Sequence, residues 1–363
     1  MPLDKRQFLI KLRIGGAVFL LLVILFKLLF NFSYPDATKS FKRLLPNFIE
    51  NKVKLFQQEV IKKLNFLLPE PYLSIIKSLL FGGKHNLPFQ LKELIRYSGL
   101  SHLVAVSGLH LAILLQIWLY FFNVWPIPKL IKFIILALII ISYVVMADFS
   151  PSILRAAVMS LIMIFALLNH RQYYSFWSLI MSVLILSAIN PQILKDIGFQ
   201  LSVLSTLGII KIYPLLFQKY KEQDILLGNN LMISLISLLK ESFLLCLSAL
   251  IMVLPLTFYY FHEFSFFTPL TNVLIVPLVP LIIILSLLVI ILSFICYPLT
   301  FLFSWFLKLL LDYFLFVINV FGNLKIARIF IAQIPLSILI IYYFLVFLFI
   351  IYQQKQIKFT VYE

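Results

Sequence analysis

Residues 100–122 read LSHLVAVSGLHLAILLQIWLYFF, and this stretch decides the fold class. It is apolar enough and long enough to enter a bilayer. Its middle nevertheless carries His102, Ser107, Gly108 and His110, where a lipid-facing helix would carry only aliphatic residues. Polar side chains at membrane depth are costly, so they face the interior of a helix bundle or a water-filled path. Glycine between two polar residues marks a break in the helix or a close approach of backbone.

Long uncharged apolar runs of this kind recur along the whole chain. Of its 363 residues, 63% are hydrophobic and only 12% are charged, a composition that a soluble domain of this size could not bury. The runs are continuous rather than alternating with period two, which excludes a transmembrane β-barrel. We therefore expect an all-α polytopic membrane protein with roughly ten transmembrane or re-entrant helices.

Four segments organise this chain. We expect an N-terminal transmembrane helix over residues 1–32, a basic amphipathic region over 33–99, a multi-span domain over 100–352 and a cytoplasmic tail over 353–363. In the second segment apolar residues recur every three to five positions among many lysines, a pattern typical of helices that lie on a membrane surface. If successive helices cross the membrane in alternating directions, the loops on the same side as the N-terminus carry the larger excess of basic residues. Both termini are therefore expected in the cytoplasm.

Other polar residues enter the apolar segments further along. Arg155 stands near the start of one of them and stays charged. It either snorkels to the headgroups or offers a fixed positive charge to an aqueous cavity, where it would meet a phosphate. Gln200 and Ser202 are expected to hydrogen-bond between helices. Asn272 precedes a run punctuated by proline.

Prolines mark three candidate helix breaks, at Pro255, Pro269 and Pro277. A break within the membrane leaves backbone carbonyls free, which is tolerated only against protein or water.

Several motifs of enzymes are missing from the sequence. No GxxxxGK[ST] phosphate-binding loop and no HExxH zinc motif occurs, and the five histidines are dispersed. Cys246 and Cys296 both lie in apolar segments, which suits buried thiols rather than a disulfide framework. We therefore predict no catalytic residues, no metal site and no cofactor.

Four short motifs, in order, resemble the competence domain of the ComEC family, the inner-membrane DNA-uptake channels of transformable bacteria. Residues 101–110 (SHLVAVSGLH) are close to the family's HLLAISGLH signature, and residues 152–159 (SILRAAVM) resemble its SxxRAxxM element. The third motif, Asn190-Pro191 followed by residues 198–202 (GFQLS), and the fourth, LPL at 254–256 followed by PLTN at 269–272 and VPL at 276–278, are similar to the remaining elements. No HxHxDH cluster of the metallo-β-lactamase-like domain found in the longest members occurs.

The resemblance implies a channel that passes single-stranded DNA across the inner (plasma) membrane, without strand degradation. It also implies a DNA receptor, a cytoplasmic ATP-driven motor, surrounding membrane lipid and a homo-oligomer as partners. A polyanion that crosses lipid needs a wet path with positive charge or hydrogen-bond donors. The side chains expected along it are His102, Ser107, Gly108, His110, Arg155, Gln200, Ser202 and Asn272.

Two alternatives remain open. Ser107 beside an intramembrane histidine is the pairing that activates a nucleophile, which would make the chain an intramembrane serine hydrolase. Broken helices at the membrane midplane are also typical of secondary transporters, here for a small anion.

Overall fold

The computed structural model describes residues 41–42, 46–82, 87–104, 107–125, 127–217, 231–324, 328–330 and 334–360. The predicted first helix, over residues 1–32, lies outside this part of the chain. Two compact units are present. One comprises Met1–Gln57 and Ser107–Gln200, and the other comprises Gln58–Val106 and Leu201–Glu363.

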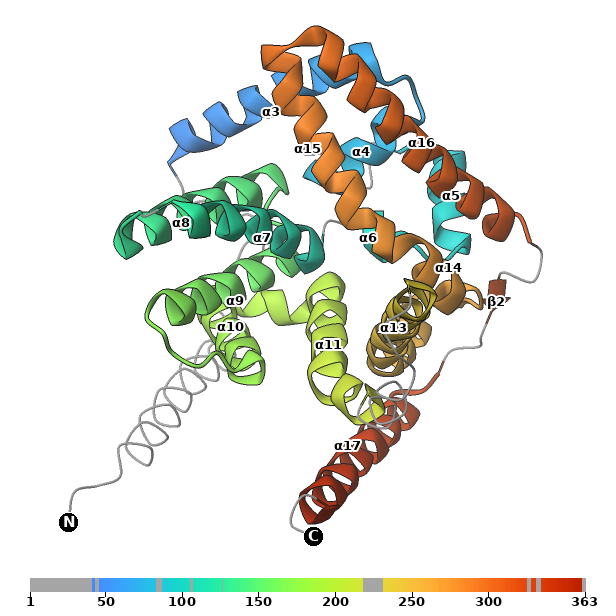
Figure 1. Cartoon of the computed structure of the whole chain (residues 1–363). Helices are drawn as coiled ribbons and strands as arrows, with labels where there is room; N and C mark the ends of the chain where they lie inside the picture. Colours follow the sequence, from blue (N-terminus) through green and yellow to red (C-terminus); the bar gives the residue numbers. More distant parts are fainter. Residues whose placement is uncertain are drawn as a thin grey trace, which may run out of the picture. The chain divides into compact units, whose positions relative to one another are not determined.

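The first unit is organised around α9 (Pro151–Leu168), which packs against three other helices (Figure 1). Proline at the first helical position starts this helix, because it has no N–H that would need an acceptor there. The neighbours of α9 are α7 (Gly108–Val124), α8 (Lys129–Met146) and α10 (Ser175–Ile189), and the 3-10 helix η2 (Pro191–Lys195) follows α10.

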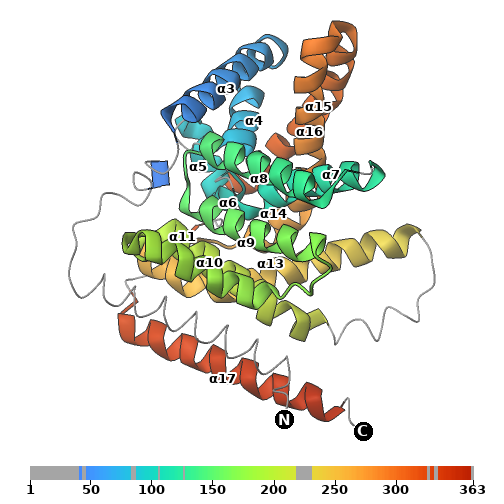
Figure 2. The ribbon, with the colours of Figure 1, turned by 90° about the vertical axis from the view of Figure 1, so that its left-hand side faces the viewer.

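The second unit holds a long antiparallel hairpin, α15 (Val279–Ile295) and α16 (Tyr297–Gly322), which turns at Cys296. In Figure 1 this hairpin is seen along its length while α13 is viewed close to its axis, so the two run in clearly different directions (Figures 1 and 2). The other elements are α4 (Tyr72–Phe81), α5 (Phe89–Tyr97), α6 (Ser101–Val104), α13 (Leu231–Phe261), β1 (Glu263–Ser265), α14 (Thr268–Ile275), η3 (Val276–Leu278), β2 (Arg328–Phe330) and α17 (Leu336–Thr360). Two helices, α3 (Asn47–Leu67) and α11 (Ile197–Lys211), have residues in both units.

Seven helical segments of the described chain are long and apolar enough to cross a membrane. Three further apolar helices are shorter, among them the first fifteen residues of α7. The predicted all-α polytopic membrane fold is therefore confirmed. The helix α17 extends to Thr360 and so includes most of the predicted tail, residues 353–363.

Only part of the region 33–99 has the amphipathic character expected of it. Along α3, the side chains of Val60 and Leu64 are buried while Phe48 and Phe66 are exposed. The helix α5 is amphipathic too, since it packs on α16, buries Leu91 and Ile95 and exposes Arg96. By contrast α4 is buried along most of its length. The apolar residues of α4 thus join the core of the second unit, because a helix with apolar residues on every side needs protein around it.

The end of α5 is tied to the segment 263–271. Arg96 donates through Nε to Glu263 (2.9 Å), which raises the pKa of the guanidinium. The Thr271 hydroxyl donates to the carbonyl of Ser98 (2.7 Å). Gly99 has a φ of +79°, and a Cβ there would lie 2.1 Å from the Thr268 hydroxyl. Only glycine allows this approach.

A proline inside α13 creates an unusual contact with α17. Pro255 has no N–H, so the carbonyl of Ile251 loses its helical partner. The Tyr342 hydroxyl of α17 donates to that carbonyl (2.8 Å), and the Tyr343 hydroxyl donates to the next carbonyl, that of Met252 (2.8 Å). Tyr342 therefore satisfies the carbonyl that the proline leaves without a helical donor, and both tyrosines link α17 to α13.

We expect Tyr342→Phe to cost about 1 kcal/mol of unfolding free energy, because a carbonyl in an apolar environment loses its donor. Pro255→Ala restores an N–H to the helix, so Tyr342→Phe should cost clearly less in that background. The measurement is a double-mutant cycle of unfolding in mixed detergent, with exposed Tyr313→Phe as control. Equal costs in both backgrounds would contradict the role of Tyr342.

Candidate functional site

The stretch 100–122 does not form one continuous helix. The short α6 ends at Val104, and Ser107 has extended backbone (φ −119°, ψ 169°) before α7 begins at Gly108. The polar residues Ser107, Gly108 and His110 therefore lie at the start of a helix, where backbone N–H groups have no helical acceptor.

His110 supplies one of the missing acceptors. Its Nδ1 accepts a hydrogen bond from the backbone N–H of Ser107 (3.0 Å), and the Ser107 hydroxyl lies 3.1 Å from the same nitrogen. This is the position at which Glu or Gln accepts in a capping box. Since Nδ1 accepts from the backbone, a neutral ring carries its proton on Nε2. The His110 side chain is buried, with 2% of its surface exposed.

Gly108 lies against α9 at the residue pair Arg155-Ala156. A Cβ on Gly108 would lie 3.1 Å from Ala156 Cβ and 3.2 Å from Arg155 Nη2. The small size of Gly108 and Ala156 thus brings the guanidinium to the first turn of α7. The structure thereby places the predicted residues Ser107, Gly108, His110 and Arg155 at one site within the first unit.

Two sources of positive potential meet at this site. Arg155 is a buried guanidinium, 6% exposed, whose Nη1 contacts Met159 Sδ (3.2 Å). The first turn of α7 carries the positive end of the helix dipole, roughly half an elementary charge. Repulsion between them is relieved by a negatively charged group, and helix N-termini are common sites for phosphate. The arrangement suits an anion, which could accept hydrogen bonds from a guanidinium and from backbone N–H groups.

The remaining predicted residues are distributed over both units. Gln200 belongs to the first unit, where its Nε2 donates to the carbonyl of Leu194 (2.8 Å), so it braces the turn before α11. His102, Ser202 and Asn272 belong to the second unit. His102 is exposed on α6, and the Ser202 carbonyl accepts from the Thr206 hydroxyl (2.8 Å).

Asn272 is buried between α14 and α13. Its side chain is 4% exposed, and Nδ2 donates to Cys246 Sγ (3.1 Å). This contact joins the two helices within the second unit. Both cysteines are free thiols.

The three prolines have different effects on their helices. The helix α13 continues through Pro255 to Phe261, whereas Pro269 lies in the first turn of α14. Pro277 lies in η3, the 3-10 turn that separates α14 from α15. The apolar run after Asn272 is therefore a helix, a turn and a second helix.

One polar cluster was not among the predicted site residues. Lys308 and Asp312 lie one helical turn apart near the middle of α16, and both are exposed. The Tyr72 hydroxyl donates to Asp312 Oδ1 (2.5 Å), and Lys308 Nζ lies 5.5 Å from the Tyr72 ring centroid. Opposite charges four residues apart in the middle of an apolar run are the sequence signal that identifies such a cluster.

Comparison with known proteins identifies relatives of the chain. The family model described as "Competence protein" matches residues 79–356. ComE operon protein 3 of Bacillus subtilis (strain 168) is 30% identical over 232 residues, which cover 64% of this chain and 28% of that protein. The chain thus spans less than a third of the length of this relative. No solved structure matches.

We expect His110→Gln to preserve the start of α7 and His110→Leu to lose about 1 kcal/mol of stability, since glutamine can accept from the Ser107 N–H and leucine cannot. Thermal unfolding of the purified variants in detergent measures this difference. If both variants unfold together with the native protein, the capping role of His110 is wrong.

Proposed function

This chain belongs to the Competence protein family, and from that premise we propose that it forms the channel through which single-stranded DNA crosses the cytoplasmic membrane during natural transformation. The observation that carries the proposal is the buried guanidinium of Arg155 beside the first turn of α7. In this interpretation the site contacts successive phosphates of a strand that moves past it.

The chemistry of the site fits a phosphodiester backbone. Guanidinium binds phosphate oxygens with two N–H groups at once, and backbone N–H groups of the first helical turn add donors without adding a mobile charge. Such contacts carry no base specificity, which suits a channel that must accept any sequence. Because the contacts are few, a phosphate can be exchanged for the next one, as conduction requires.

The direction of transport requires a source of energy outside this site. An inside-negative membrane potential opposes the entry of an anion, at about 2.3 kcal/mol per charge and 100 mV. We therefore assign the pulling force to a separate ATP-driven motor in the cytoplasm, and the delivery of the strand to a DNA receptor. A homo-oligomer surrounded by lipid completes the proposed assembly.

A serine hydrolase is the second candidate, and one observation favours it. The Ser107 hydroxyl lies 3.1 Å from His110 Nδ1, within reach for proton transfer. The same nitrogen, however, accepts the Ser107 backbone N–H at 3.0 Å. A neutral imidazole nitrogen has one lone pair, and the helix cap already uses it. A small-anion transporter would use the Arg155 site equally well, and competition between a small anion and DNA separates the two.

We expect Arg155→Gln to lower uptake of labelled single-stranded DNA about tenfold or more, since a charge-assisted hydrogen bond contributes about 1.5–3 kcal/mol. Arg155→Lys should retain part of the uptake, because it keeps the charge and loses the fork geometry. The measurement is transformation of a deletion strain that produces each variant, normalised to its abundance in the membrane.

The matched control for this experiment is Arg171→Gln. Arg171 is exposed beyond the other end of α9, so the same loss of charge should leave uptake unchanged. Normal uptake by Arg155→Gln, with the protein correctly inserted, contradicts the proposed channel site.

We expect Ser107 to remain unlabelled by a fluorophosphonate probe, because the lone pair of its histidine is engaged in the helix cap. Mass spectrometry of the purified chain after exposure to the probe gives the answer, with a known serine hydrolase as positive control. A covalent adduct on Ser107 would establish the hydrolase instead.

A further inference from the structure

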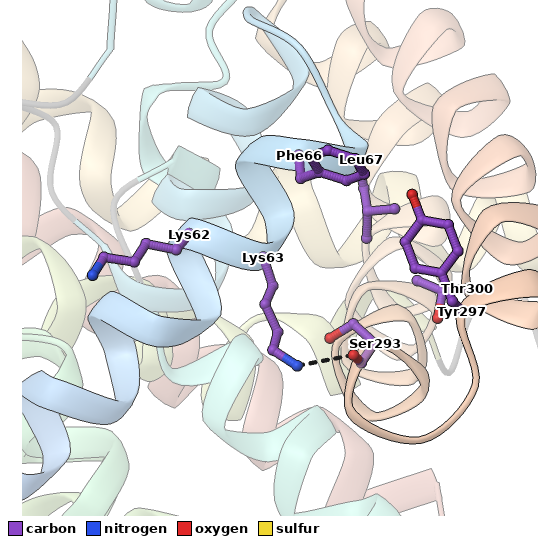
Figure 3. A pocket seen from close by; sticks show the side chains of 7 residues that line it. All are labelled: Lys62, Lys63, Phe66, Leu67, Ser293, Tyr297 and Thr300. Atoms are coloured by element: carbon purple, nitrogen blue, oxygen red, sulfur yellow. Dashed lines mark hydrogen bonds between the residues drawn. The ribbon is translucent and has the colours of Figure 1, made fainter.

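A cavity of about 290 Å³ lies where the end of α3 meets the turn of the α15–α16 hairpin, within the second unit (Figure 3). Lys62, Lys63 and Phe66 line it from α3, and Ser293 and Tyr297 line it from the hairpin. Figure 3 shows Lys63 pointing toward Ser293, while Lys62 extends in another direction from the adjacent position. Lys63 therefore directs its ammonium group toward the hairpin, whereas the ammonium group of Lys62 points elsewhere.

The contacts of Lys63 keep its charge in place. Its Nζ donates to the carbonyl of Ser293 (2.9 Å) and lies 3.5 Å from the centroid of the Phe294 ring. Both partners stabilise an ammonium, the first as one of the last carbonyls of α15 and the second through its ring face. An ammonium has three N–H donors, so two remain for a ligand.

Apolar side chains line the cavity beside these charges. Phe66 is 77% exposed, and Leu67 and the ring of Tyr297 lie in the same wall. Exposed apolar groups of this size belong in hydrocarbon rather than water. Cationic groups and apolar groups therefore meet at one place, and this is the arrangement found where lipid headgroups border their acyl chains.

We propose that this cavity binds an anionic phospholipid. Its phosphate contacts the ammonium group of Lys63, with Lys62 adding positive charge from the adjacent position, and its acyl chains lie over Phe66 and Leu67. The hydroxyl of Tyr297, whose ring lies 6.2 Å from that of Phe66, stands at the border between the two parts. A bound lipid would join α3 to the hairpin, in addition to the single hydrogen bond of Lys63.

A lipid fits these residues better than a nucleic acid does. Both ligands would use the lysines, and a base could stack on an aromatic ring. Leu67, the aliphatic residue among those that line the cavity, offers nothing to a base but fits an acyl chain. Positive charge beside the ends of membrane-spanning helices is the usual site of anionic headgroups.

The test compares Lys62→Gln/Lys63→Gln with Lys52→Gln/Lys54→Gln in the full chain. Both pairs lie on α3 and lose two charges, and only the first pair lines the cavity. Native mass spectrometry of delipidated protein then measures binding of phosphatidylglycerol, of phosphatidylcholine, of inorganic phosphate and of an oligothymidylate. Each lysine near anionic lipid contributes enough for about a fivefold change, so we expect the cavity variant to bind phosphatidylglycerol about 30-fold more weakly.

The proposal holds if phosphatidylglycerol binds more tightly than phosphatidylcholine and only the cavity variant loses this preference. It is overturned if both variants lose binding equally, if inorganic phosphate competes as well as the lipid does, or if the oligonucleotide binds here and the lipid does not. Thermal unfolding of each variant shows that it is folded. Because the readout is lipid binding, its outcome is independent of DNA uptake.

Discussion

Every backbone N–H and C=O that lipid surrounds must find a partner within the protein, and this requirement governs how the helices of this chain break and join. At Pro255 the carbonyls are satisfied by tyrosines from α17. At Ser107 an N–H is satisfied by the ring of His110. At the end of α5 the Ser98 carbonyl is satisfied by Thr271. Irregular backbone thus occurs where a neighbouring polar side chain can reach it.

The same requirement explains why Ser107, Gly108 and His110 lie at the start of a helix. A guanidinium beside the start of α7 is costly to bury, yet the site that results is preorganised for anions. Gly108 makes this possible, because a side chain there would displace Arg155 or Ala156. Arg155 of α9 and the first turn of α7 form one site only because Gly108 and Ala156, which face each other, are both small.

The sequence predicted the membrane fold, and it singled out Ser107, His110 and Arg155 because polar groups stand out within apolar runs. The hydrogen-bond partners of such polar groups are harder to predict from the sequence. The spacing of Ser107 and His110 is that of a capping box, so the cap was readable in principle. Tyr342 and Ile251 are 91 residues apart, and no local pattern joins them. Lys308 and Asp312 stand out in the sequence as charges within an apolar run, but their partner Tyr72 lies 240 residues before Asp312.

The contact between α13 and α17 has a consequence for biosynthesis. During translation Pro255 enters the membrane before Tyr342 has been made, so the carbonyl of Ile251 must wait for its donor. Until the last helix arrives, this point of α13 is a polar defect that water, lipid headgroups or the insertion machinery must shield. Synthesis of α17 then closes the defect, so that α17 stabilises α13 only after the preceding helices have been inserted.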